Sequence, residues 1–272
     1  TSYTVETLPS PIAVANPLRT GYTFLGWYDN AALTGTPITG FPAMDAAAKT
    51  FYAKWSSANN YSVTYTLNDV TPAGHPATNP NTVTSYTVLD PNVTLAPATR
   101  TGYDFEGWYD NPGFNGAPIT GFPTGDAADK HYYAKWSAAK NYTVQWHLND
   151  SAPAGHPATN PNTVANYTVE DADITVHPAT RTGYTFLGWY DNPGFTGTPV
   201  TSLHTMDAEN KNYYAKWSAA PNSYPVNYVL NDGTPAGHPA TNPAANLTSY
   251  TVLTNGSGNI SLLPALRNGY TF

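Results

Sequence analysis

The sequence predicts a mostly β protein that is built as a tandem array of small units. Two observations carry this prediction. The segment that begins at Gly21 returns at Gly102 and again at Gly183, so the chain repeats itself every 81 residues. Within each repeat the apolar side chains follow a period of two, which is typical of half-buried strands and not of helices.

A second marker, Tyr-Ala-Lys-Trp, defines the extent of the unit. It ends at Trp55, Trp136 and Trp217, each 28 positions after the tryptophan of the first marker. Short polar links follow, and links and insertions fall where the backbone is exposed. The expected organisation is the C-terminal part of a repeat at 1–55, complete repeats at 60–136 and 141–217, and the N-terminal part of a repeat at 222–272.

The elements of one unit can be read in order from residues 60–136. Alternating apolar and polar residues over 61–67 predict the first strand. An Asp-Pro-Asn turn at 90–92 separates two short strands. Prolines disfavour helix in the middle of the unit, so the one helical turn is expected at 126–130, with a counterpart at 45–49. The remaining expected strands, mostly antiparallel, are 86–88, 93–95, 102–109 and 131–136.

The composition of the chain narrows its function classes. Eleven Lys and Arg against 18 Asp and Glu give a net charge of −7, too few cations to neutralise a run of phosphates, so a nucleic acid is not an expected partner. The absence of cysteine excludes disulfides, thiolate metal sites and cysteine nucleophiles. The apolar stretches are short and interrupted, so no membrane span is expected. The start at Thr1, without Met or signal peptide, indicates a mature product or a fragment.

The histidines and the carboxylates predict neither catalytic residues, nor a metal site, nor a cofactor. The loop histidines occur once per unit without a second ligand nearby, which argues against zinc. The repeated aspartates lie in Asn/Asp turns and are expected to bond local backbone rather than calcium. The loop histidines are His75, His156 and His238; the non-repeating ones are His131, His147, His177 and His204; the turn aspartates are Asp29, Asp110, Asp191, Asp69, Asp150 and Asp232.

Paired carboxylates for glycoside cleavage are not expected either. The four glutamates are Glu6, Glu106, Glu170 and Glu209, and none of them holds the same role in every unit. An enzyme is therefore the least favoured class.

The cations and the tryptophans are the residues that the sequence singles out. Every arginine lies two positions before a Gly-Tyr pair, and six of the seven lysines occupy two repeated positions. We expect each arginine to hold a loop through a carboxylate or a carbonyl, with ligand recognition as the alternative. A Lys–Asn crosslink at the second lysine position is a weaker hypothesis. The expected anchors are Trp27, Trp55, Trp108, Trp136, Trp189, Trp217, Arg19, Arg100, Arg181 and Arg267; the lysines are Lys49, Lys130, Lys211, Lys54, Lys135 and Lys216.

The run from Arg100 to Asp110, followed by Tyr-Ala-Lys-Trp at 133–136, resembles the internalin B-repeat, also called the Listeria–Bacteroides repeat. The resemblance covers nearly the whole chain, as two complete and two partial copies. It implies a compact β-grasp-like domain of the α+β class, found in tandem on long bacterial surface or secreted proteins, with no catalytic residues to carry over. The loop at 71–80 is longer than the family pattern.

The leading hypothesis is a non-enzymatic structural segment of a long extracellular or cell-surface protein, forming an extended stalk or filament. Its expected partners are neighbouring repeats and, in a fibre, other copies of the protein. The alternative is an adhesin whose loops, such as 71–80, bind a host glycan or protein. Stacking of sugars on the aromatic residues is a further alternative, but these residues follow the strand alternation that a core requires.

Overall fold

A computed structural model describes residues 11–42, 45–71, 73–233, 236–254, 256 and 258–272. The chain divides into two compact units, Thr1–Ala138 and Ala139–Phe272, and each is described by itself. We call the segments 1–55, 60–136, 141–217 and 222–272 repeats 1 to 4. Repeats 1 and 2 lie in the first unit, and repeats 3 and 4 lie in the second.

Repeat 2 is built on a four-stranded sheet with the order β10-β12-β5-β7. The first strand of the repeat pairs in parallel with the last one, through Val63 and Lys130 at one end and Thr66 and Tyr133 at the other. The two outer pairings are antiparallel. The strands are β5 (Tyr61–Thr66), β7 (Ser85–Tyr86), β10 (Phe105–Tyr109) and β12 (Lys130–Trp136).

Two small antiparallel ladders close the loops of repeat 2 over this sheet. One pairs β6 with β9, which places Ala77 opposite Arg100. The other pairs β8 with β11, which places Val93 opposite Phe122. The strands are β6 (Ala77–Thr78), β8 (Val93–Thr94), β9 (Thr99–Arg100) and β11 (Gly121–Phe122).

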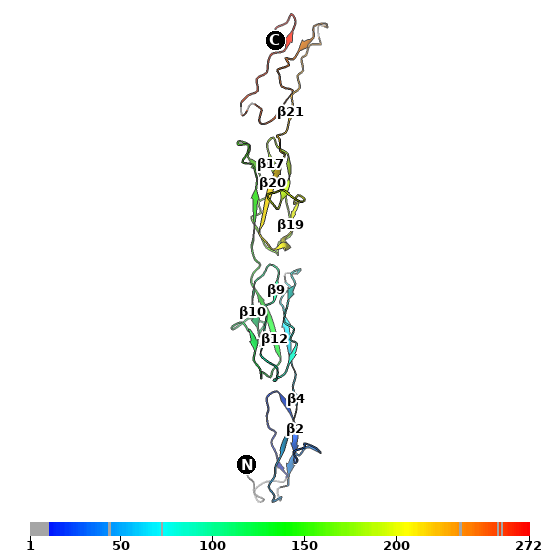
Figure 1. The fold of residues 1–272 in the computed structure, drawn as a ribbon, viewed down its shortest axis with the longest axis vertical. Coiled ribbons are helices and arrows are strands. Elements are labelled where there is room, and N and C mark those ends of the chain that lie inside the picture. The colour runs from blue at the N-terminus through cyan, green and yellow to red at the C-terminus, as the bar shows by residue number, and fades with distance from the viewer. Residues whose placement is uncertain (1–10, 43–44, 72, 234–235, 255, 257) are drawn as a thin grey trace. The chain divides into compact units, whose positions relative to one another are not determined.

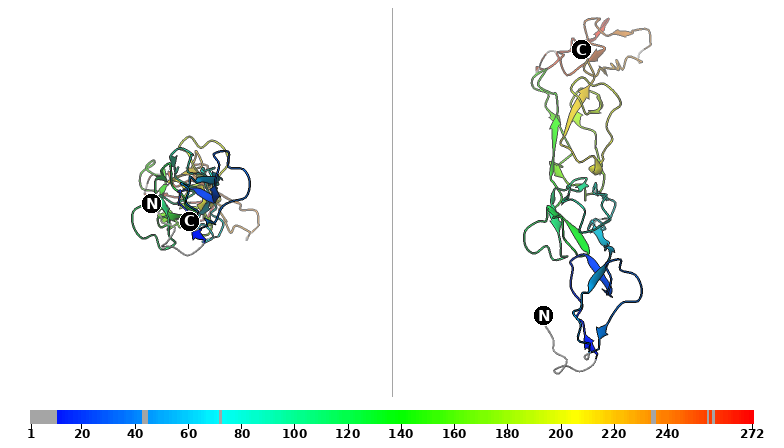
Figure 2. Two further views of the ribbon diagram at one scale, coloured as in Figure 1. Left: turned by 90° about the horizontal axis from the view of Figure 1, so that it is seen from below. Right: turned by 60° about the horizontal axis from the view of Figure 1, so that its bottom comes forward.

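Repeat 3 has the same architecture, with the sheet order β15-β13-β20-β18. Its central pair is again parallel, and the green strand β13 and the yellow strand β20 lie side by side in Figures 1 and 2. The sheet strands are β13 (Tyr142–His147), β15 (Asn166–Tyr167), β18 (Phe186–Tyr190) and β20 (Lys211–Trp217). The ladder strands are β14 (Ala158–Thr159), β16 (Ile174–Thr175), β17 (Thr180–Arg181) and β19 (Ser202–Leu203).

The two partial repeats form the ladders that their residues allow. Repeat 1 pairs β2 with β4 and β1 with β3, all antiparallel. Repeat 4 pairs β21 with β23 and β22 with β24. The strands are β1 (Ile12–Ala13), β2 (Tyr22–Tyr28), β3 (Gly40–Phe41), β4 (Tyr52–Ala58), β21 (Tyr224–Pro225), β22 (Ala240–Thr241), β23 (Ser249–Tyr250) and β24 (Leu266–Arg267).

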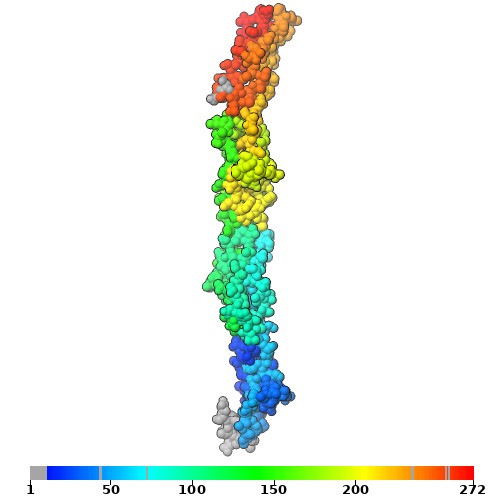
Figure 3. Space-filling model, in the orientation of Figure 1, coloured from blue at the N-terminus to red at the C-terminus, as the bar shows by residue number. Residues whose placement is uncertain are grey.

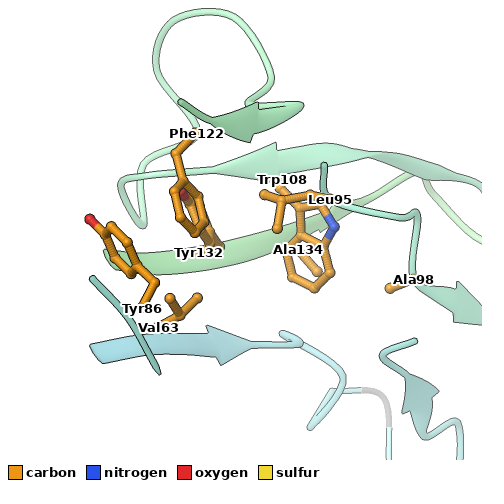
Figure 4. Packing of buried hydrophobic residues seen from close by; sticks show 8 residues of the cluster. All are labelled: Val63, Tyr86, Leu95, Ala98, Trp108, Phe122, Tyr132 and Ala134. Carbon is orange, nitrogen blue, oxygen red and sulfur yellow. The ribbon is translucent and has the colours of Figure 1, made fainter. Parts of the chain in front are cut away.

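Each complete repeat has its own hydrophobic core on one face of its sheet. In repeat 2 the core side chains converge from β5, β10 and β12 and from the loops above them (Figure 4). The side chains alternate along β12, where Tyr132 and Ala134 are buried and His131 is exposed. The core residues are Val63, Tyr86, Leu95, Ala98, Trp108, Phe122, Tyr132 and Ala134, and in repeat 3 Val144, Tyr167, Val176, Ala179, Trp189, Leu203, Tyr213 and Ala215.

The structure confirms a mostly β array, and it corrects one element of the sequence prediction. The helical turn expected at 126–130 is wrong: these residues form a loop, and Lys130 already belongs to β12. The counterpart at 45–49 is not helical either. Gly125 has φ of +85°, which a right-handed helix cannot accommodate. Repeat 3 has Met206 at the equivalent position and forms a short 3₁₀ helix, Thr205–Asp207.

Candidate functional site

In repeats 1, 2 and 3 two tryptophans enclose one phenylalanine. In repeat 2 the ring of Phe105 lies 5.4 Å from the rings of both Trp108 and Trp136, edge to face in each case. The antiparallel register of β10 and β12 places Phe105 directly opposite Trp136. Since this register fixes the cluster, the constant spacing of 28 residues between the tryptophans has a structural cause. The same cluster occurs around Phe24 and around Phe186.

The indole nitrogens of these tryptophans hold the loops at the edge of the sheet. Trp108 donates to the carbonyl of Ala96 at 2.9 Å, and Trp136 donates to that of Leu67 at 2.7 Å. Buried indoles need such partners. The equivalent bonds recur with the same spacing along the chain: Trp27 to Ala15, Trp189 to His177, and Trp217 to Leu148.

Three arginines, Arg100, Arg181 and Arg267, tie loops of their own repeats. Arg100 is buried, and its guanidinium donates to the carbonyls of His75 at 2.9 Å and Thr71 at 3.1 Å. It also lies 4.0 Å above the ring of Tyr103. The rigid fork of the guanidinium lets one side chain bond two segments of the long loop at once. Arg181 and Arg267 bond the equivalent carbonyls of His156 and His238, and Arg19 lies over Tyr22.

The two lysine positions have different surroundings. At the first position each lysine forms an ion pair with the aspartate four residues earlier, as in Lys130 with Asp126 at 2.7 Å. At the second position the ammonium lies beside aromatic rings: Lys216 is 5.0 Å from the ring centre of Tyr190. Lys135 also pairs with Glu106 at 3.0 Å, and both side chains are about two-fifths exposed. This open ion pair does not resemble the dry pocket that a Lys–Asn crosslink requires.

The turn aspartates after Leu-Asn bond backbone amides, as the sequence predicted for both sets of turn aspartates. Asp69 accepts the N–H of Ala77 at 2.6 Å, and Asp150 and Asp232 accept the equivalent N–H groups of Ala158 and Ala240. The aspartates after Trp-Tyr instead accept a hydrogen bond from the side-chain amide of the next residue, as Asp110 does from Asn111 Nδ2 at 2.9 Å. No group of three potential metal ligands occurs in the part of the chain that the structure describes, which leaves out Glu6.

One Ser–His–Asp arrangement occurs in repeat 3. Ser202 Oγ lies 3.4 Å from His204 Nε2, and His204 Nδ1 lies 2.7 Å from Asp173. The imidazole and the carboxylate are more than half exposed. Asp173 also accepts the backbone N–H of Thr205 at 3.0 Å. The hydrogen bond from His204, together with that N–H, lowers the pKa of Asp173.

Repeat 2 provides an internal comparison for this arrangement. Its equivalent positions hold Gly121, Pro123 and Asn92, and the Asn92 amide oxygen accepts the N–H of Thr124 at 2.7 Å. An amide therefore makes the same loop tie without any serine or histidine. Catalysis by a triad also needs a sheltered base and oriented donors for an oxyanion. The exposed pair in repeat 3 is better explained as a loop tie.

The other histidines lie at the surface or within loops. His131 stacks on Tyr133 and His147 stacks on Tyr214, both at 4.4 Å between ring centres. His75 is buried against Tyr103, and its Nδ1 has no hydrogen-bond partner among the described residues. The histidines are therefore not brought together into one site.

A groove at the end of repeat 3 lies beside the anchor residues Arg181 and Trp217. It has a volume of about 480 Å³ and combines aromatic rings with two cations. Unlike Lys135, Lys216 has a leucine, Leu187, in place of the glutamate that faces it in repeat 2. The groove is lined among others by Arg181, Tyr184, Phe195, Lys216, Trp217 and Leu253.

Two sets of contacts were not predicted from the sequence. Asp129 accepts the N–H of Ser62 at 2.7 Å, and in repeat 3 Asn210 accepts that of Thr143 at 2.9 Å. The glycines of the Arg-x-Gly-Tyr segments contact valines of the next repeat, for Gly21 and Gly183. The Gly and Val positions recur in the sequence, but which glycine contacts which valine depends on the fold.

Comparison with known proteins places the chain among repeat proteins. The model of the Listeria–Bacteroides repeat domain matches residues 2–54, 61–135 and 142–216. Two relatives come from Evansella cellulosilytica, and they carry provisional names, one as a membrane protein and the other as a Gly-rich membrane protein. Each is 29% identical over 230 residues, which is 80% of this chain.

The chain spans 31% of the first relative and 24% of the second. No solved structure matches it. Within the described ranges, no helix has the length and apolar character needed to cross a membrane. Three consecutive matches, with the same aromatic cluster in each matched segment, identify the chain as a member of the Listeria–Bacteroides repeat family.

Proposed function

We propose that the chain is a non-enzymatic structural segment of a long extracellular or cell-surface protein, and that it forms an extended stalk or filament. The observation that supports this most is the repetition of the same Trp–Phe–Trp cluster and the same arginine tie in successive repeats. The chemistry-bearing residues of the repeats hold loops, and the arrangement of Ser202, His204 and Asp173 in repeat 3 is explained in the same way. This pattern is typical of structural repeat proteins, in which every unit has the same fold.

The surface location is supported by two lines of reasoning. The relatives are named as membrane proteins, and the internalin B-repeat, which this sequence resembles, occurs on bacterial surface proteins. A chain without cysteine also folds outside the cell without disulfide chemistry or mispairing. The tyrosine, threonine and asparagine content gives such a segment a weakly charged, hydrated surface.

Solution scattering tests the proposal. A compact globule of this length has a radius of gyration of about 18 Å, whereas four small units in a row have one of about 30 Å or more. We expect the larger value, and we expect the maximum dimension to grow linearly when further repeats are added. A value near that of the globule would contradict the stalk.

Adhesion is the second candidate, and the groove at the end of repeat 3 is the observation that favours it. Aromatic faces can stack on sugar rings, and Lys216 and Arg181 can attract a carboxylate. A glycan array with the whole chain, repeated with Lys216→Gln, tests this candidate. Binding to acidic glycans that is lost in the variant would favour an adhesin, and a silent array would favour a purely structural segment.

A further inference from the structure

In two Arg-x-Gly-Tyr segments, those of repeats 1 and 3, the glycine lies against a valine of the following repeat. A Cβ atom placed on Gly21 would lie 2.2 Å from Cγ1 of Val88, and one placed on Gly183 would lie 2.3 Å from Cγ1 of Val252. Both glycines are buried. Carbon atoms without a bond do not approach so closely, so any side chain at these positions would displace the valine.

The link between the repeats closes over the same glycines. The carbonyl of Gly21 accepts the N–H of Asn59 at 2.8 Å, and the carbonyl of Gly183 accepts that of Asn222 at 2.7 Å. The side chains of the two asparagines also accept hydrogen bonds from threonines, Thr23 at 3.1 Å and Thr185 at 2.8 Å. The link is therefore fixed to the preceding repeat at the point where the valine makes contact.

The valines are held at the tips of short turns. In repeat 2 the turn after β7 is closed by Asp90, whose carboxylate accepts the N–H of Thr87 at 2.6 Å. In repeat 4 the hydroxyl of Thr254 accepts the N–H of Thr251 at 2.8 Å. A carboxylate and a hydroxyl thus close the same turn, and Val88 and Val252 follow its first residue in each case.

We propose that this glycine and valine form the interlocking surface between repeats 1 and 2 and between repeats 3 and 4, with the next repeat of the same chain as the partner. The glycine provides a socket, the valine fills it, and the asparagine of the link holds the two together. The socket requires glycine for two reasons, the absence of a side chain and a φ of +77° at Gly21 and +80° at Gly183. The inference concerns how repeats associate, and it does not depend on a stalk function.

Gly269 shows the same segment without a valine. Its φ is +81°, it is exposed, and a Cβ atom placed on it would meet nothing within 4 Å. The φ angle of the glycine is therefore about the same with and without a valine beside it.

Spin labels in the first unit test the proposal directly. Because the chain has no cysteine, Thr39→Cys and Thr120→Cys place one label at the same exposed position of repeats 1 and 2. Pulsed electron paramagnetic resonance on the whole chain then reports the distribution of distances between the two spin labels. We expect a narrow distribution in the parent, and a broader, shifted one in Val88→Ala and in Gly21→Ala.

The controls separate the contact from backbone strain and from unfolding. Gly35 also has a positive φ, +91°, but nothing lies within 4 Å of its Cβ position, so Gly35→Ala should leave the distribution narrow. Tryptophan fluorescence establishes that each variant is folded. The proposal is overturned if the distance distribution of Val88→Ala is as narrow as that of the parent. It is also overturned if Gly35→Ala changes the distribution as much as Gly21→Ala does.

Discussion

At the scale of single residues, the aromatic cluster explains why each repeat needs both tryptophans. Trp108 is 1% exposed, packs edge to face on Phe105, and satisfies its indole nitrogen on a loop carbonyl. Trp136 is less buried and packs on the other side of the same ring. One residue thus fills the core, and the other covers its end.

Truncating the buried tryptophan should therefore be costly. We expect Trp108→Ala to lower the free energy of unfolding of repeat 2 by about 3–5 kcal/mol, because it leaves a large cavity and an unpaired carbonyl. Urea unfolding of the whole chain measures the loss of free energy. Amide hydrogen exchange in repeats 2 and 3 shows in which repeat the loss occurs. Leu89→Ala, at a side chain that is 69% exposed, is the control and should change stability by about 0.5 kcal/mol or less. Equal effects of the two variants would contradict the cluster's importance.

The arginine tie makes a separate prediction. In Arg100→Lys the ammonium cannot reach both loop carbonyls at once, so the loop should lose about 1–3 kcal/mol of stabilisation. Faster amide exchange over residues 73–80 is the expected signature. The matched control is Arg267→Lys in repeat 4, where the arginine is partly exposed and the cost should be smaller. Unchanged exchange in Arg100→Lys would show that the loop is held by other contacts.

Two buried tyrosines predict the alkaline limit of stability. Burial raises the pKa of Tyr132 and of Tyr213 to about 12. These values lie above the ordinary tyrosine pKa of about 10. The stabilisation that comes from burying the two protonated tyrosines is therefore complete below about pH 10, and it is lost as the pH rises through the raised pKa. We expect unfolding in this range, with Tyr132→Phe and Tyr213→Phe together moving it to higher pH. Absorbance and circular dichroism followed together measure it, and the exposed Tyr52→Phe should cause no such movement.

At the scale of elements, the ends of the central strands are tied by side chains that differ between repeats. Asp129 and Asn210 accept the N–H of the residue after the first tyrosine of β5 and β13, respectively. The backbone N–H of Ser62, followed by its side chain, lowers the pKa of Asp129. Two residues with different chemistry thus make one contact, and only one of them titrates.

This difference predicts a pH effect that is confined to repeat 2. The carboxylate of Asp129 stabilises the tie above the ordinary aspartate pKa of about 3.9, and the contribution is lost as the pH falls through the lowered value. The amide proton shift of Ser62 should therefore titrate in acid, whereas that of Thr143 should not. Asp129→Asn should abolish the titration at Ser62. A titration that persists in this variant would assign the effect to another carboxylate.

The order of the elements could be predicted from the sequence, and their pairing could not. Alternation along 61–67 and 131–136 predicted β5 and β12, because side-chain period is a local property. Their parallel pairing depends on residues that lie more than 60 positions apart, and no local signal reports it. The helical turn at 126–130 was wrong because the spacing of Asp126 and Lys130 suits a helix, whereas the structure forms the same ion pair between a loop residue and the first residue of β12.

The candidate site was predictable only in part for the same reason. The positions of Arg100 and Trp108 stood out because they recur, but their partners, carbonyls of His75 and Ala96, carry no sequence signal. Backbone acceptors are identical along the chain, so only the fold selects them. Repetition could indicate which residues matter, and geometry was needed to show what they hold.

At the scale of the whole molecule, the sparse charge predicts a weak dependence on salt. Most cations are paired or lie beside aromatic rings within their own repeat, and the net charge is −7. We expect no retention on heparin or DNA columns at physiological salt, and a melting temperature that changes little up to 1 M salt. A lysine-rich domain of similar size serves as the retained control. Retention of the chain would require a basic patch that its composition does not suggest.

The loops after the Trp-Tyr-Asp segments of repeats 1 to 3 are exposed at their tips. They project from the surface of their own repeats in Figure 3, and residues 34–37, 115–118 and 196–199 are exposed. Each loop is closed at its base by an asparagine, as in Asn111 with Asn115. Length changes at these tips should leave the core of the repeat intact.

The parallel pairing of the first and last strands of a repeat has a mechanical consequence. The chain enters repeat 2 at the start of β5 and leaves it at the end of β12, and these points lie at opposite ends of one hydrogen-bonded pair. Tension along the chain therefore pulls the two strands past each other and loads their hydrogen bonds together, in shear. Strands joined by a hairpin would instead be opened one bond at a time. A repeat with this topology resists a pulling force with all the bonds of its central pair at once.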